Sequence, residues 1–204
     1  MKKVILNLGC GRCYIKNAIN VDFLINDCCD LVVNLNEFPW EWREDSVDEI
    51  YMLYFLEHFD KDIVIKIFKE CHRILKVNGL VHIQVPHYSS MIALTDLGHK
   101  TAFGVTSFGV LEGSNYIFPN ALFKKETIKI NILETLLQEN KYLDLDLEKT
   151  TIIKSHHSLL RFILSPLKIF FQYFIDLAPI IFERFWCYYI GGAGEIIYRG
   201  RKVK

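Results

Sequence analysis

Three histidines and one glutamate are the residues best suited to acid–base chemistry in this sequence. Glu57 and His58 are adjacent, and His87 and His99 follow further along the chain. A neighbouring carboxylate can orient an imidazole and raise its basicity, so Glu57 and His58 could act as a general base or position a substrate. The alternative is that this pair only fixes a loop by hydrogen bonds. His87 and His99 are candidates for contacts to a substrate.

A glycine-rich turn near the amino terminus is the candidate ligand-binding site. Residues 4–8 form an apolar run that contains Asn7, and Gly9-Cys10-Gly11 follows directly. Glycines let the backbone approach a ligand closely because they have no Cβ. Asp22 ends the next apolar run, residues 18–22. A carboxylate at the tip of a second strand can accept hydrogen bonds from both ribose hydroxyls, so we expect a ligand that contains a nucleoside.

Two common nucleotide-binding motifs do not fit this turn. A dinucleotide fingerprint requires a third glycine, and Tyr14 stands at that position. A P-loop would continue with Gly-Lys-Ser or Gly-Lys-Thr, which is absent from the sequence here. A nicotinamide-dependent oxidoreductase is therefore disfavoured, and a phosphate-cradling loop is excluded.

Short apolar runs predict the strands that would position these residues. They cover residues 4–8, 18–22, 31–33, 48–53, 80–85 and 195–198, and alternating isoleucines and leucines add candidates at 128–132 and 143–147. An apolar stripe predicts a helix over residues 61–76, with Asp60 as N-cap and Asn78-Gly79 as its end. In an open sheet, ligands bind at the carboxyl ends of the strands, where Gly9, His58 and His87 are expected.

These segments together resemble one family. The chain resembles class I S-adenosylmethionine-dependent methyltransferases, most closely the small bacterial ones that begin with Leu-Asn-Leu-Gly-Cys-Gly and continue through Ile-Asn-Val-Asp. The resemblance extends over residues 4–112 and includes the segments 30–36, 38–40, 46–51, 56–59, 75–80 and 85–87. A weaker similarity returns at residues 183–186 and 193–196.

The resemblance implies a fold and a cofactor. It implies a Rossmann-like α/β fold with a seven-stranded, mostly parallel sheet, helices on both faces, an antiparallel last strand and a helical cover near the carboxyl terminus. It implies S-adenosylmethionine, bound by Asn7, Gly9, Cys10, Gly11, Asp22, Asn34, Leu35, Leu53, Tyr54 and Glu57. Relatives often have an acidic residue where Asn34 stands and a histidine where Tyr54 stands. Asn34 can still bind an adenine amine or instead cap its loop, and Tyr54 can donate a hydrogen bond or cover the cofactor.

The implied reaction is methyl transfer to a small molecule or a glycan, at oxygen. An alcohol acceptor must lose a proton, which a histidine can take, so His58, His87 and His99 are the catalytic candidates. The family's occurrence among surface-sugar biosynthesis enzymes favours a sugar. The alternatives are a non-catalytic, cofactor-binding partner subunit and the oxidoreductase.

Composition limits the class of protein. The 204 residues predict a single domain, 1–204, and the formal net charge of zero does not indicate a nucleic-acid partner. Six cysteines and an amino terminus without a targeting segment predict a cytoplasmic protein. Cys10 and Cys13 form a C-x-x-C motif, which could indicate zinc or redox chemistry or simply small residues buried in a turn. Burial is favoured, and no metal site is predicted.

An aromatic-rich segment, residues 155–192, is predicted as a helical insertion before the last strand. Charged residues and prolines interrupt its apolar part, residues 159–190, so a transmembrane helix is rejected. Two readings stay open. The segment covers the active site or a partner subunit, as in a homodimer, or it lies on the inner face of a membrane as a peripheral contact.

Overall fold

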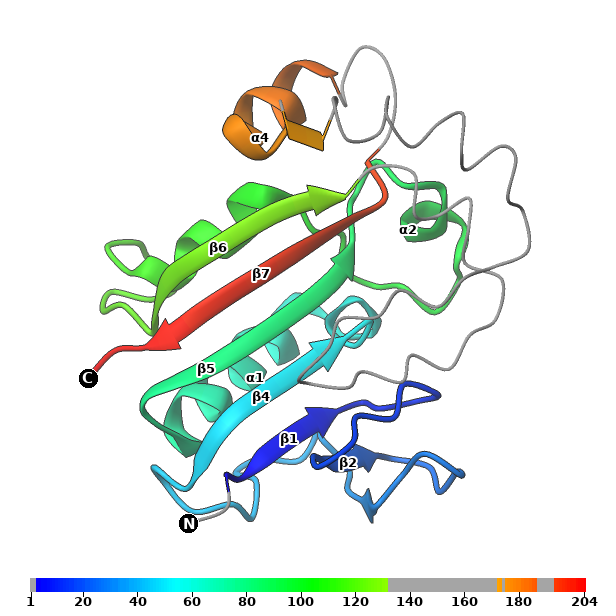
Figure 1. Ribbon diagram of the computed structural model, residues 1–204, viewed down its shortest axis with the longest axis vertical. Coiled ribbons are helices and arrows are strands. Elements are labelled where there is room, and N and C mark those ends of the chain that lie inside the picture. Colours follow the sequence, from blue (N-terminus) through cyan, green and yellow to red (C-terminus); the bar gives the residue numbers. More distant parts are fainter. Residues whose placement is uncertain (1–2, 132–171, 174, 187–192) are drawn as a thin grey trace.

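The computed structural model describes residues 3–131, 172–173, 175–186 and 193–204 (Figure 1). These residues form one seven-stranded sheet in the order β3-β2-β1-β4-β5-β7-β6. The strands are β1 (Ile5–Leu8), β2 (Ile19–Asp22), β3 (Leu31–Val32), β4 (Val47–Leu53), β5 (Leu75–Pro86), β6 (Phe123–Asn131) and β7 (Glu195–Lys202). The predicted strands are thus confirmed, although the candidate at 143–147 lies outside the described residues.

The direction of the strands follows the prediction. The pairs β3–β2, β2–β1, β1–β4 and β4–β5 are parallel, whereas β7 runs antiparallel to both β5 and β6. Because β7 runs antiparallel to β5, its first residues reach the edge at which β4 and β5 end. Residues distant in sequence therefore meet at this edge of the sheet (Figure 1).

Helix α1 (Lys61–Ile74) covers one face of the sheet. Its buried side chains Val64, Ile67, Phe68, Cys71 and Ile74 lie at helical spacing and share one core with apolar side chains of β4, β5 and β7. The 3-10 helix η2 (Val105–Glu112) joins the same core, because Phe108 stacks on Tyr198 of β7 at a centroid distance of 5.0 Å. The packing of α1 and η2 on the sheet thus forms the main core of the described residues.

The predicted end of the first helix was wrong. Helix α1 ends at Ile74, and strand β5 begins at once with Leu75. Asn78 does adopt a positive φ of 66°, but it does so inside β5, where the register against β4 shifts between Val47 and Glu49. The Asn-Gly pair therefore forms an irregularity in a strand instead of a helix cap. Asp60 is the N-cap residue, although its side chain makes no capping hydrogen bond.

Shorter elements surround the carboxyl edge of the sheet. They are the 3-10 turn η1 (Leu56–His58) after β4, helix α2 (Met91–Thr95) after β5, and helix α4 (Pro179–Ile181) with the π-helical turn η4 (Phe182–Trp186) before β7. Most of the predicted insertion at 155–192 lies outside the described residues. Within the described part of the chain, no helix is long and apolar enough to span a membrane.

The partly buried His82 on β5 should make the folded chain less stable in acid. Burial, followed by the charge of Arg199, lowers the pKa of its imidazole from 6.5 to about 4, and Glu49 and Glu126 oppose the shift. The unfolded chain binds a proton at His82 below pH 6.5, whereas the folded chain stays neutral until about pH 4. The free energy of unfolding should therefore fall as the pH drops through this window, by at most about 3 kcal/mol.

Urea denaturation of wild type and His82→Phe between pH 7 and pH 4 measures this contribution. The phenyl ring keeps the stacking on Tyr51, which lies at a centroid distance of 4.3 Å, and cannot be protonated. We expect a shallower loss of stability in the variant. Equal pH dependence in both proteins would show that His82 does not contribute.

Candidate functional site

The turn after β1 is held against the segment that follows β4. Gly9 has a φ of +66°, and a Cβ placed on it would lie 2.0 Å from Cδ2 of Phe55. Only glycine fits there, because both the conformation and the space exclude a side chain. Gly11 also has a positive φ, +49°, but no heavy atom lies within 4 Å of the position of its Cβ. The turn is thus packed at Gly9 and open at Gly11.

Asn7 stabilises the glycine turn through side-chain hydrogen bonds. Its buried amide donates hydrogen bonds to the Cys13 carbonyl at 2.6 Å and to the Asn20 side chain at 2.9 Å. The Asn20 side chain in turn accepts from the Ile15 N–H at 2.9 Å. These bonds fix the path of the chain between β1 and β2. Asn7 therefore shapes the glycine turn, and its buried Oδ1 has no hydrogen-bond partner among the described residues.

Asp22 lies beside the glycine turn at the end of β2. One carboxylate oxygen accepts the Gly11 N–H at 2.7 Å, and the other accepts the N–H groups of Phe23 at 2.8 Å and Leu24 at 3.3 Å. The Cys10 thiol lies 3.9 Å from the first of these oxygens as a fourth and weak donor. A carboxylate has about four lone-pair positions, so a ligand hydroxyl could replace this weak bond. Asp22 thus connects the open position at Gly11 to the tip of β2.

Asn34 and Leu35 follow the edge strand β3. Asn34 is exposed; its amide donates to Glu37 at 2.6 Å, and its side-chain oxygen accepts the Asn36 N–H at 3.2 Å. Leu35 is buried in the main core. Asn34 therefore caps its own loop in this structure. This is the second of the two roles expected from the sequence, the first being a contact to an adenine amine.

A polar cluster joins the ends of β4, β5, β6 and β7. Tyr54 follows the buried Leu53 at the end of β4 and has a φ of +53°. Its hydroxyl donates to the buried Glu195 carboxylate, which also accepts from Gln84 at 2.6 Å and from Asn131 at 2.7 Å. The Tyr54 side chain is thus directed toward β7. Neither Gln84 nor Asn131 can be identified from the sequence, because only the antiparallel placement of β7 brings them to Glu195.

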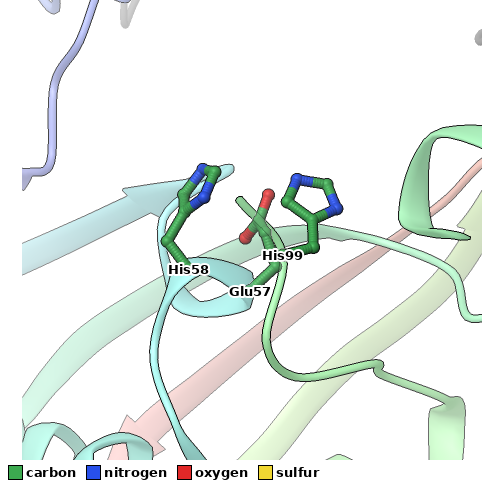
Figure 2. A group of neighbouring side chains, drawn as sticks. All are labelled: Glu57, His58 and His99. Atoms are coloured by element: carbon green, nitrogen blue, oxygen red, sulfur yellow. The ribbon is translucent and has the colours of Figure 1, made fainter. Parts of the chain in front are cut away.

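Glu57, His58 and His99 form a compact cluster at the carboxyl end of β4. One ligand-type atom of each side chain lies within 4.8 Å of the others, and Figure 2 shows the Glu57 carboxylate between the two imidazole rings. The rings of His58 and His99 have a centroid distance of 5.0 Å and meet edge to face. His58 is exposed, whereas Glu57 is 1% exposed. Two of the three predicted catalytic histidines are therefore brought together, and Glu57 joins them.

Main-chain hydrogen bonds hold the two segments of this cluster together. The Glu57 carbonyl accepts the N–H groups of Lys100 at 2.7 Å and Thr101 at 3.1 Å. The Thr101 hydroxyl donates to the Phe59 carbonyl at 2.7 Å, and Nδ1 of His58 lies 3.3 Å from the Gly98 carbonyl. Residues 96–101 are thus fixed over the turn η1, which explains how His99 reaches His58.

The Glu57 carboxyl group is an unusual acid. Neither of its oxygens has a hydrogen-bond partner in the described structure. Burial raises its pKa to about 8, and the negative charge of Asp96 acts in the same direction. A carboxyl group with such a pKa exchanges protons near neutral pH, as general acids and bases must.

His87 lies in a separate, buried network. Its side chain is 0% exposed; Nδ1 is 2.7 Å from the Ser89 hydroxyl and Nε2 is 3.1 Å from Glu183. Glu183 also accepts the Val105 N–H at 2.6 Å. Both ring nitrogens are therefore engaged in contacts that join β5, η2 and η4, which is a structural arrangement. That His87 contacts an acceptor stays a prediction.

The cysteines near the glycine turn are thiols in this structure. Cys10 and Cys28 are buried, and Cys13 and Cys29 are partly buried. Burial raises the pKa of the Cys10 thiol to about 12, with the Asp22 charge as the second cause. Cys10 is therefore a weak nucleophile at neutral pH.

Comparison with known proteins identifies the fold. No protein-family model matches the sequence, and no curated protein matches it. A SAM-dependent methyltransferase from Archaeoglobus fulgidus is 17% identical, with a TM-score of 0.55 over 98% of this chain and 86% of that one. A SAM-dependent methyltransferase from Methanosarcina mazei is 11% identical, with a TM-score of 0.51 over 100% of this chain and 94% of that one.

A third similar structure contains ligands. It is phosphoethanolamine N-methyltransferase 2 of Haemonchus contortus in complex with phosphomonomethylethanolamine and S-adenosylhomocysteine, 16% identical, with a TM-score of 0.51 over 100% of this chain and 50% of that one. Together these similarities show that the chain has the class I S-adenosylmethionine-dependent methyltransferase fold.

Proposed function

We propose that this chain, which has the fold of class I methyltransferases, is an S-adenosylmethionine-dependent methyltransferase that acts at an oxygen of a small molecule or a glycan. The observation that supports it most is the alignment of two sites along one edge of the sheet. The glycine turn with Asp22 stands at the ends of β1 and β2, and the Glu57–His58–His99 cluster stands at the end of the neighbouring β4.

The residues at the glycine turn fit the cofactor. The space above Gly11 admits a ligand, and the adjacent Asp22 carboxylate could accept a ribose hydroxyl in place of its weak bond from the Cys10 thiol. That Asn34 and Leu35 contact the adenine side stays a prediction, because Asn34 caps its own loop and Leu35 lies in the main core; Leu53 would face the methionine side. When bound, S-adenosylmethionine supplies a methyl group. Loss of this group turns its positively charged sulfur into a neutral thioether.

The Glu57–His58–His99 cluster is suited to receive the acceptor. His58 is the exposed member, so its imidazole is the group that can take a proton from an acceptor hydroxyl. The neighbouring Glu57 carboxyl group would stabilise the charge that develops on the imidazole once it has lost its own proton. An in-line displacement requires the reacting atoms to be held about 3 Å apart, so the fixed position of residues 96–101 would also orient the acceptor.

The topology disfavours the oxidoreductase alternative. A dinucleotide-binding fold continues after the fifth strand with a parallel sixth strand in the order 3-2-1-4-5-6. Here the strand beside β5 is the antiparallel β7. The non-catalytic partner subunit remains the competing proposal. It predicts cofactor binding without turnover, or a chain that has kept only the fold. A cytoplasmic location is a further proposal that the composition supports, and the aromatic-rich segment 155–192 motivates two more, a homodimer and a peripheral membrane contact.

Asp22→Asn should weaken cofactor binding. The amide keeps the shape of the side chain but loses the negative charge and one acceptor oxygen, so we expect the affinity for S-adenosylmethionine to fall about tenfold, or by about 1.4 kcal/mol. Isothermal titration calorimetry on the folded variant measures the change. Asp27→Asn is the matched control, because Asp27 is an exposed residue of the same loop. Equal affinity in wild type and Asp22→Asn would contradict the assignment of this edge to the cofactor.

A further inference from the structure

We propose that Glu57, His58 and His99 bind a divalent first-row transition-metal ion through one carboxylate and two imidazoles. The ligand-type atoms of the three side chains lie within 4.8 Å of one another. Metal–nitrogen and metal–oxygen bonds of about 2.0–2.2 Å place neighbouring ligand atoms about 3–4 Å apart, so one ion can reach all three with small side-chain movements. This inference goes beyond the proposed function and does not depend on it.

The Glu57 carboxylate is the strongest reason for a cation. It is 1% exposed, and neither oxygen has a hydrogen-bond partner among the described residues. A buried charge without a partner is costly, and natural proteins pair such groups or use them to coordinate metals. Lys100, which follows His99 in the sequence, is 3.5 Å from Asp60 and so has its own acidic partner. A metal ion would supply the missing positive charge.

The two histidines are oriented as metal ligands usually are. Nδ1 of His58 lies 3.3 Å from the Gly98 carbonyl, so a proton on this nitrogen leaves Nε2 with its lone pair. Nε2 of His99 lies 3.7 Å from the Asp96 carboxylate, whereas its Nδ1 is buried without a partner in the described chain. Ligating histidines typically direct one nitrogen at the metal and the other at a carbonyl or carboxylate. Both rings match this pattern.

The donor set indicates the class of metal. Imidazole nitrogens suit zinc, copper, iron and nickel, whereas magnesium and calcium prefer oxygen-only sites. Two histidines and one carboxylate leave coordination positions open, as in catalytic sites, and the exposed His58 marks the solvent side. An oxygen acceptor could occupy such an open position. With the ion bound, Nε2 of His58 would hold the metal instead of taking the acceptor proton. The ion would then lower the pKa of the acceptor hydroxyl, and its proton would leave to solvent.

Manganese is a suitable probe because the chain also contains six cysteines. Zinc and cobalt bind thiolates well, whereas Mn²⁺ binds thiolates weakly and prefers oxygen ligands such as the Glu57 carboxylate. The electron paramagnetic resonance signal of free Mn²⁺ decreases when the ion is bound. Titration of the full chain with Mn²⁺ alone, without S-adenosylmethionine, therefore reports binding independently of methyl transfer.

We expect one Mn²⁺ per chain and at least a tenfold loss of affinity in His58→Ala, His99→Ala and Glu57→Gln. His58 is exposed, so His58→Ala is the variant expected to keep the fold best. His72→Gln is the control, because His72 lies on α1 with its Nε2 3.2 Å from the Val203 carbonyl. Circular dichroism confirms that each variant is folded.

Thermal denaturation provides a second readout. Mn²⁺ that binds only the folded chain should raise the midpoint of unfolding of wild type and of His72→Gln, but not that of His58→Ala. Absence of binding by folded wild type at millimolar Mn²⁺ would overturn the proposal. So would binding that persists unchanged in His58→Ala and Glu57→Gln. Either result would leave the cofactor site at Gly9–Gly11 unaffected.

Discussion

His58→Ala should reduce methyl transfer by a factor of about 10²–10⁴, the usual contribution of a group that manages the acceptor proton. The cluster gives the reason: His58 is the exposed member, and the Glu57 carboxylate lies between it and His99. The measurement is the rate of S-adenosylhomocysteine release, first used to screen hydroxyl-bearing small molecules and glycans for an acceptor.

The affinity for S-adenosylmethionine distinguishes this role from a structural one. His58 lies at the end of β4, whereas the proposed ribose contact, Asp22, is at the end of β2. We therefore expect His58→Ala to bind the cofactor as wild type does and to lose only turnover. His72→Gln should keep both properties. Full turnover in folded His58→Ala would refute the proposed role of the cluster.

The sequence predicted the sheet well because its signals are local. A strand followed by Gly9 and Gly11, and a second strand that ends in Asp22, can be recognised within short windows. The end of α1 was less predictable, because Asn78 and Gly79 favour a positive φ equally in a helix cap and in a strand irregularity. The pairing of β5 with β4 places these two residues in a strand irregularity and not in a helix cap.

The site itself was only partly predictable. His58 and Glu57 are adjacent, so their association needs no tertiary information. His99 joins them through the hydrogen bonds from Lys100 and Thr101 to the Glu57 carbonyl, and no residue type encodes main-chain bonds of this kind. The link between Tyr54 and Glu195 likewise depends on where β7 inserts.

Gly9→Ala should destabilise the chain by about 2–5 kcal/mol. A positive φ at a residue with a side chain costs about 1–2 kcal/mol, and the new Cβ would collide with the Phe55 ring. Overpacking of this kind typically costs about 1–3 kcal/mol more. Phe55 cannot move freely, because it is 6% exposed and packs edge to face on Phe59 at 4.7 Å. Such a loss is a large part of the stability of a typical domain, and urea denaturation measures it.

Gly11→Ala is the matched control for this prediction. Its φ is also positive, but its Cβ would meet no heavy atom within 4 Å, so we expect only the conformational cost of about 1–2 kcal/mol. The same Cβ would enter the space assigned to the cofactor, so Gly11→Ala should bind S-adenosylmethionine more weakly than wild type. In Gly9→Ala, the additional change Phe55→Leu should restore part of the stability, because it makes room for the new methyl group. Equal stabilities of Gly9→Ala and Gly11→Ala would contradict the packing described for the turn.

Calorimetric titration of the wild-type chain with S-adenosylmethionine, S-adenosylhomocysteine and NADH tests the central claim most directly. We predict that both sulfur compounds bind one site with micromolar dissociation constants, about −8 kcal/mol, and that NADH does not bind. Binding of NADH alone would support the oxidoreductase instead. If the folded chain bound none of the three, the proposal of a cofactor at the Gly9–Gly11 turn would be wrong.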